Sequence, residues 1–485
     1  FMPIKAIKFI LFPLLFCFLL QSCEKEEDTP NLGPSDLTIL YTNDEHGWIS
    51  ETDDTDGAAK LMGVWRDVEG YTENSSYLIL SGGDNWTGPA ISTWFQGEST
   101  VETMNAMGYS AAAIGNHEFD FQVAGLQERV AQANFPYLSA NIRLKSNDSI
   151  PDFVEPYVTR EVNDILVGII GLTTRSASYT AFPTYVEDFN FIDYDEALRE
   201  YVPQIWAEGV EIILCVAHIC EFEMMGLVIQ AKELGISMIG GGHCHALVSE
   251  IRGAGTVALI EGGSRMDYYA RLDIWYNRET MTVSNLAATT FENFGGTADP
   301  AVESVVNSWE AATSQALGEV IGYTEVQIGR SSPEMHNLVT DSWLYNYPNA
   351  DIAITNSGGI RQAIEAGEIT KGDIVGVLPF DNNILELRLT GQEVIDCLQN
   401  HVVAGMTTSQ GYRHSDGTAF NRDSVYSVLT TDYLYIQEDN FFQAYDPDPY
   451  YTEMNYHQPT VDYILSLNTD SSNPLDNYLD YTPRR

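Results

Sequence analysis

The stretch LTILYTNDEHG, residues 37–47, is a short apolar run that ends directly in an amide, two carboxylates and an imidazole. A short apolar run bounded by polar residues is typical of a buried β-strand. In layered α/β proteins, the loops at strand ends carry the chemistry. The stretch therefore predicts a buried strand that delivers Asp44 and His46 to a functional edge.

Further apolar runs end in the same way. They include Tyr77–Leu80 before GGDN, Ala111–Ile114 before GNHEFD, Ile212–Ala217 before His218, and Ile236–Ile239 before GGHCH. Any one of these motifs is a weak signal, because Asp-x-His is usually a turn and a lone histidine is usually a semi-buried, hydrogen-bonded imidazole. The ordered set predicts that seven oxygen and nitrogen ligands converge on one metal centre: Asp44, His46, Asp84, Asn116, His218, His243 and His245.

The segments TNDEHG, GGDN, GNHEFD, AH and GGHCH resemble the calcineurin-like metallophosphoesterase superfamily. Together with the C-terminal half, they resemble the 5'-nucleotidase family over nearly all of the chain. The resemblance implies an α/β fold, a four-layered α/β/β/α metallophosphoesterase sandwich followed by a second, smaller α/β substrate-binding domain.

The same resemblance implies two divalent metal ions, drawn from Zn, Mn, Co and Mg. It assigns Asp44, His46 and His245 to one ion, assigns Asn116, His218 and His243 to the other, and makes Asp84 the bridge. In some relatives an amide residue stands at the position of His245. Two such ions would polarise phosphoryl oxygens and lower the pKa of a bound water for in-line attack.

Two more residues of GNHEFD are candidates for catalysis. His117 follows Asn116 directly, so its side chain is expected beside the ions, and Asp120 lies three residues on, where it can orient that imidazole. By resemblance, His117 stabilises the charged transition state or protonates the departing oxygen. The alternative that His117 only supports the ligands by hydrogen bonding stays open.

The C-terminal half carries ADIAITNSGGIRQAI, VLPFDNN and TTDYLYIQED, which resemble the C-terminal domain of 5'-nucleotidases. That domain binds the nucleoside and closes over the metal site. Phe380 and Tyr433 suit a base by stacking, and Arg361 suits a phosphate. Taken singly, such aromatics are more often core residues and such an arginine is more often a surface cation. The candidate substrate-binding residues are Asn356, Arg361, Phe380, Asn382, Tyr433, Asp439 and Arg330.

This half departs from the family pattern in several places. Asp381 stands where glycine is usual, Tyr433 replaces phenylalanine, and Gln437-Glu438 replaces Gly-Gly. The segment GRSSPEMHN is one residue shorter than the usual run between an arginine and an asparagine in the family. The resemblance therefore leaves the place of Arg330 open. These departures leave the preferred nucleotide open as well.

The N-terminus reads as a targeting segment. Lys5 and Lys8 precede the apolar run Phe9–Leu20, which is too short for a permanent membrane span and suits a signal peptide over residues 1–22. The sequence LQSC resembles the lipobox of bacterial lipoproteins, which implies a lipid on Cys23 and a periplasmic or cell-surface protein anchored at a bacterial membrane. An ordinary signal peptide with an incidental cysteine is the alternative.

The remaining boundaries follow from composition and capping. Residues 23–35 read as a charged, Pro- and Gly-containing tether, and 36–298 as the metallophosphoesterase catalytic domain. Asp299-Pro300 is a helix-starting pair, so 299–318 is expected to form an interdomain helix. Residues 319–485 are then the nucleotide-binding domain.

Charge and cysteine content set further limits. The 485 residues include 24 Lys and Arg against 69 Asp and Glu, a formal net charge of −45, which argues against a nucleic-acid polymer as partner. Beyond the targeting segment, Cys215, Cys220, Cys244 and Cys397 are expected to be buried or semi-buried thiols, with a Cys215–Cys220 bridge left open.

The sequence thus predicts an exported, metal-dependent phosphoric monoester hydrolase of 5'-nucleotidase type. Its expected substrates are nucleoside 5'-monophosphates, with nucleotide diphosphates and nucleotide sugars as further candidates. A 2',3'-cyclic-nucleotide 2'-phosphodiesterase with 3'-nucleotidase activity is the alternative within the fold. An inactive surface nucleotide-binding lipoprotein is the alternative of another class, and the complete ligand set argues against it.

Overall fold

The computed structural model describes residues 33–52, 55–73, 75–408 and 411–485. The predicted signal peptide, Cys23 and nearly all of the predicted tether lie outside the described residues. Within the described ranges, none of the helices combines the length and the apolar character that a membrane crossing requires.

The first large sheet has the strand order β14-β13-β1-β2-β3-β4. Its parallel part is β1 (Leu37–Thr42), β2 (Tyr77–Ser81), β3 (Ala111–Ala113) and β4 (Tyr137–Leu138), and its antiparallel edge is β13 (Tyr268–Asn277) and β14 (Thr282–Glu292). Since the parallel strands point the same way, the loops after β1, β2 and β3 leave the same edge of the sheet.

The second large sheet has the order β11-β12-β10-β9-β7-β6. Its parallel centre is β7 (Ile165–Leu172), β9 (Ile212–Ala217), β10 (Ile236–Gly240) and β12 (Val257–Gly262), with β6 (Tyr157–Val162) and β11 (Leu247–Arg252) as antiparallel edges. The predicted runs before His218 and GGHCH are therefore neighbouring parallel strands.

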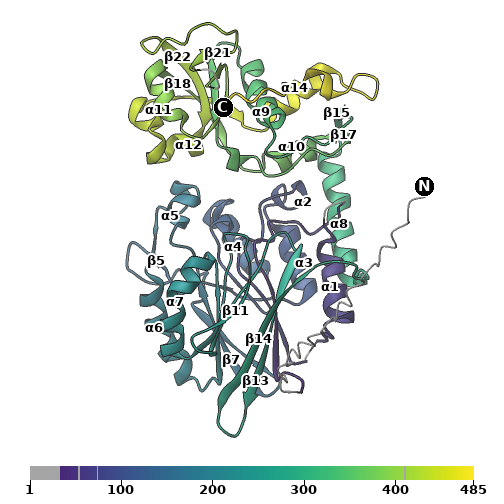
Figure 1. The fold of residues 1–485 in the computed structure, drawn as a ribbon, viewed down its shortest axis with the longest axis vertical. Coiled ribbons are helices and arrows are strands. Elements are labelled where there is room, and N and C mark those ends of the chain that lie inside the picture. Colours follow the sequence, from purple (N-terminus) through teal and green to yellow (C-terminus); the bar gives the residue numbers. More distant parts are fainter. Residues whose placement is uncertain (1–32, 53–54, 74, 409–410) are drawn as a thin grey trace, which may run out of the picture. The chain divides into compact units, whose positions relative to one another are not determined.

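The two sheets pack face to face. Ile39 and Tyr41 of β1 share one buried cluster with Val167 of β7 and Leu214 of β9, whereas Leu40 points to the opposite face and packs with helices. Such alternation is the two-residue period of a strand. The helices α1 (Gly57–Asp67), α3 (Glu98–Met107) and α4 (Gln122–Gln132) cover the first sheet, and α6 (Tyr194–Ala207) and α7 (Glu221–Leu234) cover the second (Figure 1). The predicted four-layered α/β/β/α sandwich is confirmed.

A helix follows the sandwich at α8 (Pro300–Leu317). The Asp299 carboxylate caps it by accepting hydrogen bonds from the backbone N–H groups of Ala301 and Val302, at 3.0 and 3.3 Å, and it pairs with Arg66 at 2.6 Å. Proline at the first helical position loses no hydrogen bond, because that N–H has no partner within the helix.

The rest of the chain forms the second α/β region. Its main sheet has the order β19-β16-β22-β18-β23, made of β16 (Ile352–Thr355), β18 (Asn383–Thr390), β19 (Val402–Ala404), β22 (Val425–Thr431) and β23 (Tyr450–Asn455). Two apolar clusters pack against this sheet and include residues of the helices α9 (Pro333–Asn346), α10 (Lys371–Val377), α11 (Gly391–Leu398), α12 (Asp432–Ile436), α13 (Phe442–Tyr445) and α14 (Gln458–Leu467).

Short elements complete the described chain. They are α2 (Ala90–Thr93), α5 (Ala177–Thr180), and the strand pairs β5 (Ile142–Leu144) with β8 (Phe189–Phe191), β15 (Val320–Thr324) with β17 (Gly367–Thr370), and β20 (Met406–Thr407) with β21 (Arg413–His414).

Candidate functional site

The seven predicted ligands follow the carboxyl ends of β1, β2, β3, β9 and β10. Side-chain ligand atoms of six of them, and of His117, gather in overlapping groups whose members lie within 4.8 Å of one another. The groups are Asp44 with His46 and His245, His46 with Asp84 and His117, and Asp84 with His218 and His243. Asn116, the seventh predicted ligand, is buried and lines the same cavity as His46, Asp84 and His243.

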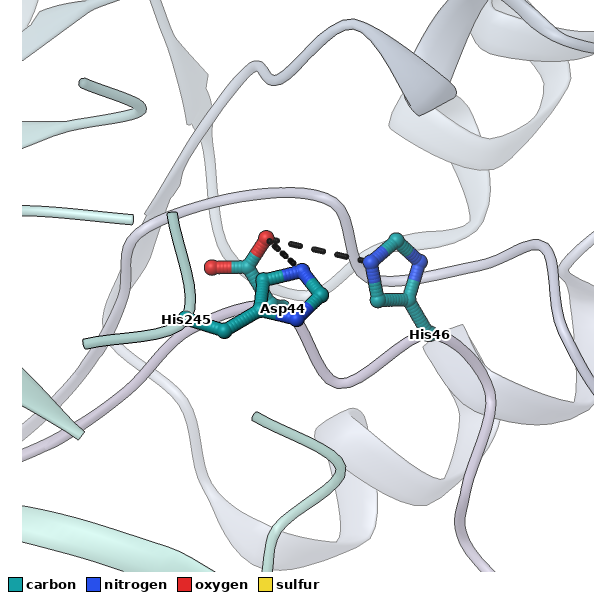
Figure 2. A group of neighbouring side chains, drawn as sticks. All are labelled: Asp44, His46 and His245. Atoms are coloured by element: carbon teal, nitrogen blue, oxygen red, sulfur yellow. Dashed lines mark ion pairs between the residues drawn. The ribbon is translucent and has the colours of Figure 1, made fainter. Parts of the chain in front are cut away.

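The first group centres on the fully buried carboxylate of Asp44. Its Oδ1 atom lies 3.3 Å from Nε2 of His245 and 3.8 Å from Nε2 of His46, and Figure 2 shows both imidazoles turned toward that oxygen. The Nδ1 atom of His46 lies 3.2 Å from the carbonyl oxygen of Thr87, which fixes the ring with Nε2 directed inward.

The second group centres on Asp84. Nε2 of His218 lies 2.9 Å from Oδ2 of Asp84, and the His218 and His243 rings are 5.1 Å apart, edge to face. Nδ1 of His218 lies 2.8 Å from the carbonyl oxygen of Gly82, which turns Nε2 toward the carboxylate. Asp84 thus lies in two of the three groups, as a bridging ligand would.

The donor set fits divalent cations. Among the predicted ligands, the buried Oδ1 atoms of Asp44 and Asn116 have no hydrogen-bond partner, and Nε2 of His218 faces the Asp84 carboxylate. A buried polar atom without a partner is costly, so each of these two oxygens calls for a water or an ion. Carboxylate, amide and imidazole together suit Zn, Mn or a similar metal.

The electrostatics of the ligands agree with this fit. Burial would raise the pKa of Asp84, but His218 and His117 hold it well below its usual range. Burial would lower the pKa of His218, but Asp84 raises it to about 10. Burial, together with His218, lowers the pKa of His243 to about 4, so its lone pair is available at neutral pH. The carboxylates attract positive charge strongly at this point.

The backbone is strained at the same place. Five of the seven predicted ligands have positive φ values: Asp44 (50°), His46 (45°), Asp84 (55°), His243 (74°) and His245 (55°). This region disfavours residues with a side chain, and such strain persists only where the surrounding structure imposes it. The surrounding structure therefore holds these loops in a conformation that sets the positions of the ligand side chains.

His117 and Asp120 form the predicted pair. Nδ1 of His117 lies 2.7 Å from Oδ2 of Asp120, and the backbone N–H of His117 donates to Oδ1 of Asp84 at 2.8 Å. Burial would lower the pKa of His117, but Asp120 and Asp84 raise it, which favours the imidazolium form. The ring therefore presents Nε2 beside the ligands and can carry a proton.

Two buried glutamates that the sequence analysis did not single out support the ligand loops. Glu118 accepts hydrogen bonds from the backbone N–H groups of Asp84, Asn85 and Gly115, at 2.8, 2.7 and 2.6 Å. Burial and the neighbouring Asp84 raise the pKa of Glu118 to about 8. Glu45 similarly accepts from Ser81 and Asn85. The sequence signal that could have identified these two glutamates is their place within the motifs GNHEFD and TNDEHG.

A cavity of about 350 Å³ opens over the ligands. Five of the seven predicted substrate-binding residues line it, together with His117 and Asp120: Asn356, Arg361, Phe380, Asn382 and Tyr433. The cavity is also lined by three residues that the sequence analysis missed, Thr180, Phe182 and Tyr185. Ser176, which it also missed, lies nearby, with its Oγ 3.3 Å from Nε2 of His243. All four come from residues 176–185, which include α5 and carry no motif.

The cavity combines aromatic and cationic groups. Phe380 stacks beside His117 with ring centroids 5.8 Å apart, and the Arg361 guanidinium lies 5.8 Å from the Phe380 ring. Nη2 of Arg361 also lies 3.5 Å from Nε2 of His46, so this cation reaches the ligand cluster. Asn382 donates to the Asp432 carboxylate at 2.9 Å, which holds its amide in place.

The other two predicted substrate-binding residues lie elsewhere. Arg330 lines a separate cavity of about 610 Å³ together with Trp48 and Arg265, and its Nε donates to the carbonyl of Ile360 at 2.9 Å. Asp439 is exposed and absent from the lining of the first cavity, and its carbonyl accepts from Gln399. The structure therefore does not bring these two together with the other five.

The cysteine expectation is wrong in one respect. Cys220 and Cys244 form a disulfide with Cα atoms 5.1 Å apart, whereas Cys215 and Cys397 are buried free thiols. The Cys215–Cys220 bridge is excluded by this pairing. The two bonded residues are 24 positions apart, and only the folded loops bring them together.

Comparisons with known proteins agree with this architecture. Residues 319–420 match the family model of the 5'-nucleotidase, C-terminal domain. The chain is 27% identical over 435 residues to the snake venom 5'-nucleotidase of Gloydius brevicauda, covering 79% of this chain and 72% of that protein. The resemblance to the 5'-nucleotidase family is confirmed.

Two further matches are a relative that is longer than this chain and a solved structure with the same fold. The trifunctional nucleotide phosphoesterase protein YfkN of Bacillus subtilis is 26% identical over 486 residues, covering 85% of this chain, which spans only 32% of that protein's length. The crystal structure of a 5'-nucleotidase precursor from Thermus thermophilus superposes with a TM-score of 0.75 at 22% identity, covering 92% of this chain and 98% of the other. The latter match shows the shared fold.

Proposed function

We propose that the chain is an extracytoplasmic phosphohydrolase that uses two divalent metal ions to remove phosphate from nucleoside 5'-monophosphates. The observation that carries this proposal is the gathering of six of the predicted ligands into one cluster, with unpartnered oxygens on Asp44 and Asn116, beneath a cavity lined by aromatic and cationic groups. The names of the relatives, a 5'-nucleotidase and a nucleotide phosphoesterase, support the same substrate class.

The ligand assignment follows two of the groups described above, the one that contains Asp44 and the one that contains His218 and His243. Asp44, His46 and His245 would hold one ion, and His218, His243 and Asn116 the other, with Asp84 shared. When bound, such ions lower the pKa of a coordinated water and neutralise the phosphoryl oxygens.

The chain's own groups supply the remaining steps. His117, oriented by Asp120 and beside Asp84, is placed to donate a proton to the departing ester oxygen or to stabilise its charge. Arg361 reaches His46 and can pair with the phosphate as a charge-assisted hydrogen-bond donor. Phe380 and Tyr433 offer ring faces for the base, a contact worth roughly 1 to 3 kcal/mol.

The domain boundaries and the location are proposals of the same kind. Residues 36–298 would form the catalytic domain, 299–318 the connecting helix, and 319–485 the nucleotide-binding domain. Export with a lipid on Cys23 would place the enzyme in the periplasm or on the cell surface. The Cys220–Cys244 disulfide supports an oxidising compartment.

The test is phosphate release from a nucleotide panel after chelator treatment, with Mn, Zn, Co or Mg added back. AMP should be hydrolysed only when metal is restored. A preference for 3'-AMP or cyclic nucleotides would favour the alternative phosphodiesterase, an activity compatible with the trifunctional relative's name. Nucleotide binding without phosphate release under every metal would overturn the enzyme proposal.

A further inference from the structure

The GGHCH loop carries two predicted ligands and one half of the disulfide. Cys244 lies between His243 and His245, and Cys220 lies two residues after His218. The bond therefore joins the two segments that supply three of the four imidazoles assigned to the ions.

The loop needs external support, because its ligands have unfavourable backbone angles. His243 and His245 have φ values of 74° and 55°. Backbone hydrogen bonds hold the loop on either side: Gly242 N–H donates to the Ile219 carbonyl at 3.0 Å, and Ala246 N–H donates to Glu261 at 2.7 Å. Cys244 lies between these two anchors, so the disulfide fixes the middle of the loop.

The other half of the bond is firmly placed. Cys220 is 4% exposed and caps the start of α7, where its backbone N–H donates to the Glu223 carboxylate at 3.1 Å. Cys244, in contrast, is exposed. The disulfide thus ties an exposed, strained ligand loop to a buried helix start.

We propose that the Cys220–Cys244 disulfide positions His243 and His245 and thereby sets the metal affinity of the site. This inference rests on the metal centre of the proposed function. Groups that orient metal ligands without touching the metal usually contribute 10- to 100-fold in affinity. The disulfide acts on the ligands in the same indirect way.

The test is the double variant Cys220→Ser with Cys244→Ser, titrated with Mn²⁺ and Zn²⁺ in competition with a chelator of known affinity. The dissociation constant should rise about 10- to 100-fold. At saturating metal, kcat should return to within a few-fold of the wild type, because the ligands themselves are intact. A purely structural role would not produce this split between metal affinity and kcat.

Two control variants separate positioning from general effects. Cys397→Ala removes a buried free thiol that lies in the C-terminal region, and its metal affinity should match the wild type. Asp299→Ala destabilises the chain at the cap of α8, outside the ligand loops, and should also bind metal normally. Weakened metal binding in Asp299→Ala equal to that of the double variant would overturn the proposal.

Reduction of the wild-type protein provides a second measurement if the double variant fails to fold. Tris(2-carboxyethyl)phosphine supplies two electrons to the disulfide, which takes up two protons to give two thiols, while the phosphine takes oxygen from water and becomes its oxide. After desalting under argon, the reduced protein should show the same weakened binding of Mn²⁺, the metal used for this measurement because freed thiols can themselves bind Zn²⁺.

The outcomes distinguish this proposal from the function it rests on. Metal affinity within two-fold of the wild type, in the double variant or in the reduced protein, would overturn the positioning role. Disulfide-dependent metal binding in a protein that releases no phosphate would refute the hydrolase function and leave the positioning role standing.

Discussion

Gly115→Ala tests directly whether the geometry around Asp84 matters. A Cβ atom at position 115 would lie 2.1 Å from Oδ1 of Asp84 and 2.7 Å from its backbone nitrogen, whereas real Cβ contacts essentially never fall below 3.0 Å. The carboxylate must therefore move by about 1 Å. A displacement of this size at a catalytic group costs on the order of 10²-fold in rate.

The assay combines metal content by mass spectrometry with kcat/KM for AMP. Gly115→Ala should lose about 10²-fold in kcat/KM and part of its bound metal. Gly226→Ala is the matched control, because a Cβ there meets nothing within 4 Å and the position lies inside α7. Its activity should be normal, and its stability should rise by roughly 0.5 to 1 kcal/mol. Full metal content and activity in Gly115→Ala would refute the reasoning.

Further predictions concern catalysis, helix capping and pH. His117→Ala should lower kcat about 10²- to 10⁴-fold with both ions still bound; unchanged turnover would remove His117 from the chemistry. Asp299→Ala removes the α8 cap and the Arg66 partner, so calorimetry should show a loss of about 1 kcal/mol with kcat unchanged, and an unaltered Tm would contradict this. Burial lowers the pKa of His401 below 6.5, so the unfolded state binds the proton first as pH falls. Stability from this residue is complete above pH 6.5 and is lost as pH falls from there through the lower pKa of the folded state. The free energy of unfolding of His401→Gln, measured with urea, should therefore change less with pH between 7.5 and 5.5 than that of the wild type, by up to about 1.4 kcal/mol per pH unit. Equal pH dependence in the two proteins would refute the assignment.

The layered fold was predictable because local patterns determine it. Each apolar run before a ligand motif became a largely buried strand, three residues long at Ala111–Ala113 and five or six residues long elsewhere, since consecutive apolar residues of this kind leave few other solutions. The Asp299-Pro300 pair started a helix for a similarly local reason, because a side-chain oxygen satisfies the first free N–H groups. Parallel strands then bring the ligand motifs to one edge.

Other features depend on distances that the sequence does not contain. Cys220 and Cys244 pair because β9 and β10 are neighbours, and nothing in their spacing favours this pairing over Cys215–Cys220. Glu118 appears in the motif as an ordinary acidic residue, and its three backbone hydrogen bonds emerge only when two loops meet.

The placement of substrate-binding residues was predictable only in part. Phe380 and Tyr433 lie in the cavity over the ligands, but Arg330 lines the second cavity, and Asp439 is exposed outside the first. Both lie near segments where the sequence departs from the family pattern, so motif order alone did not determine their surroundings. Their roles in binding stay predictions.

The most direct measurement is an anomalous-difference map from crystals grown or soaked with Mn²⁺ and recorded near the manganese edge. Two peaks roughly 3.5 to 4 Å apart are expected, with the Asp84 carboxylate between them and Asp44 and His218 on either side. A map with no peak among these side chains, or a peak held by other residues, would contradict the central claim.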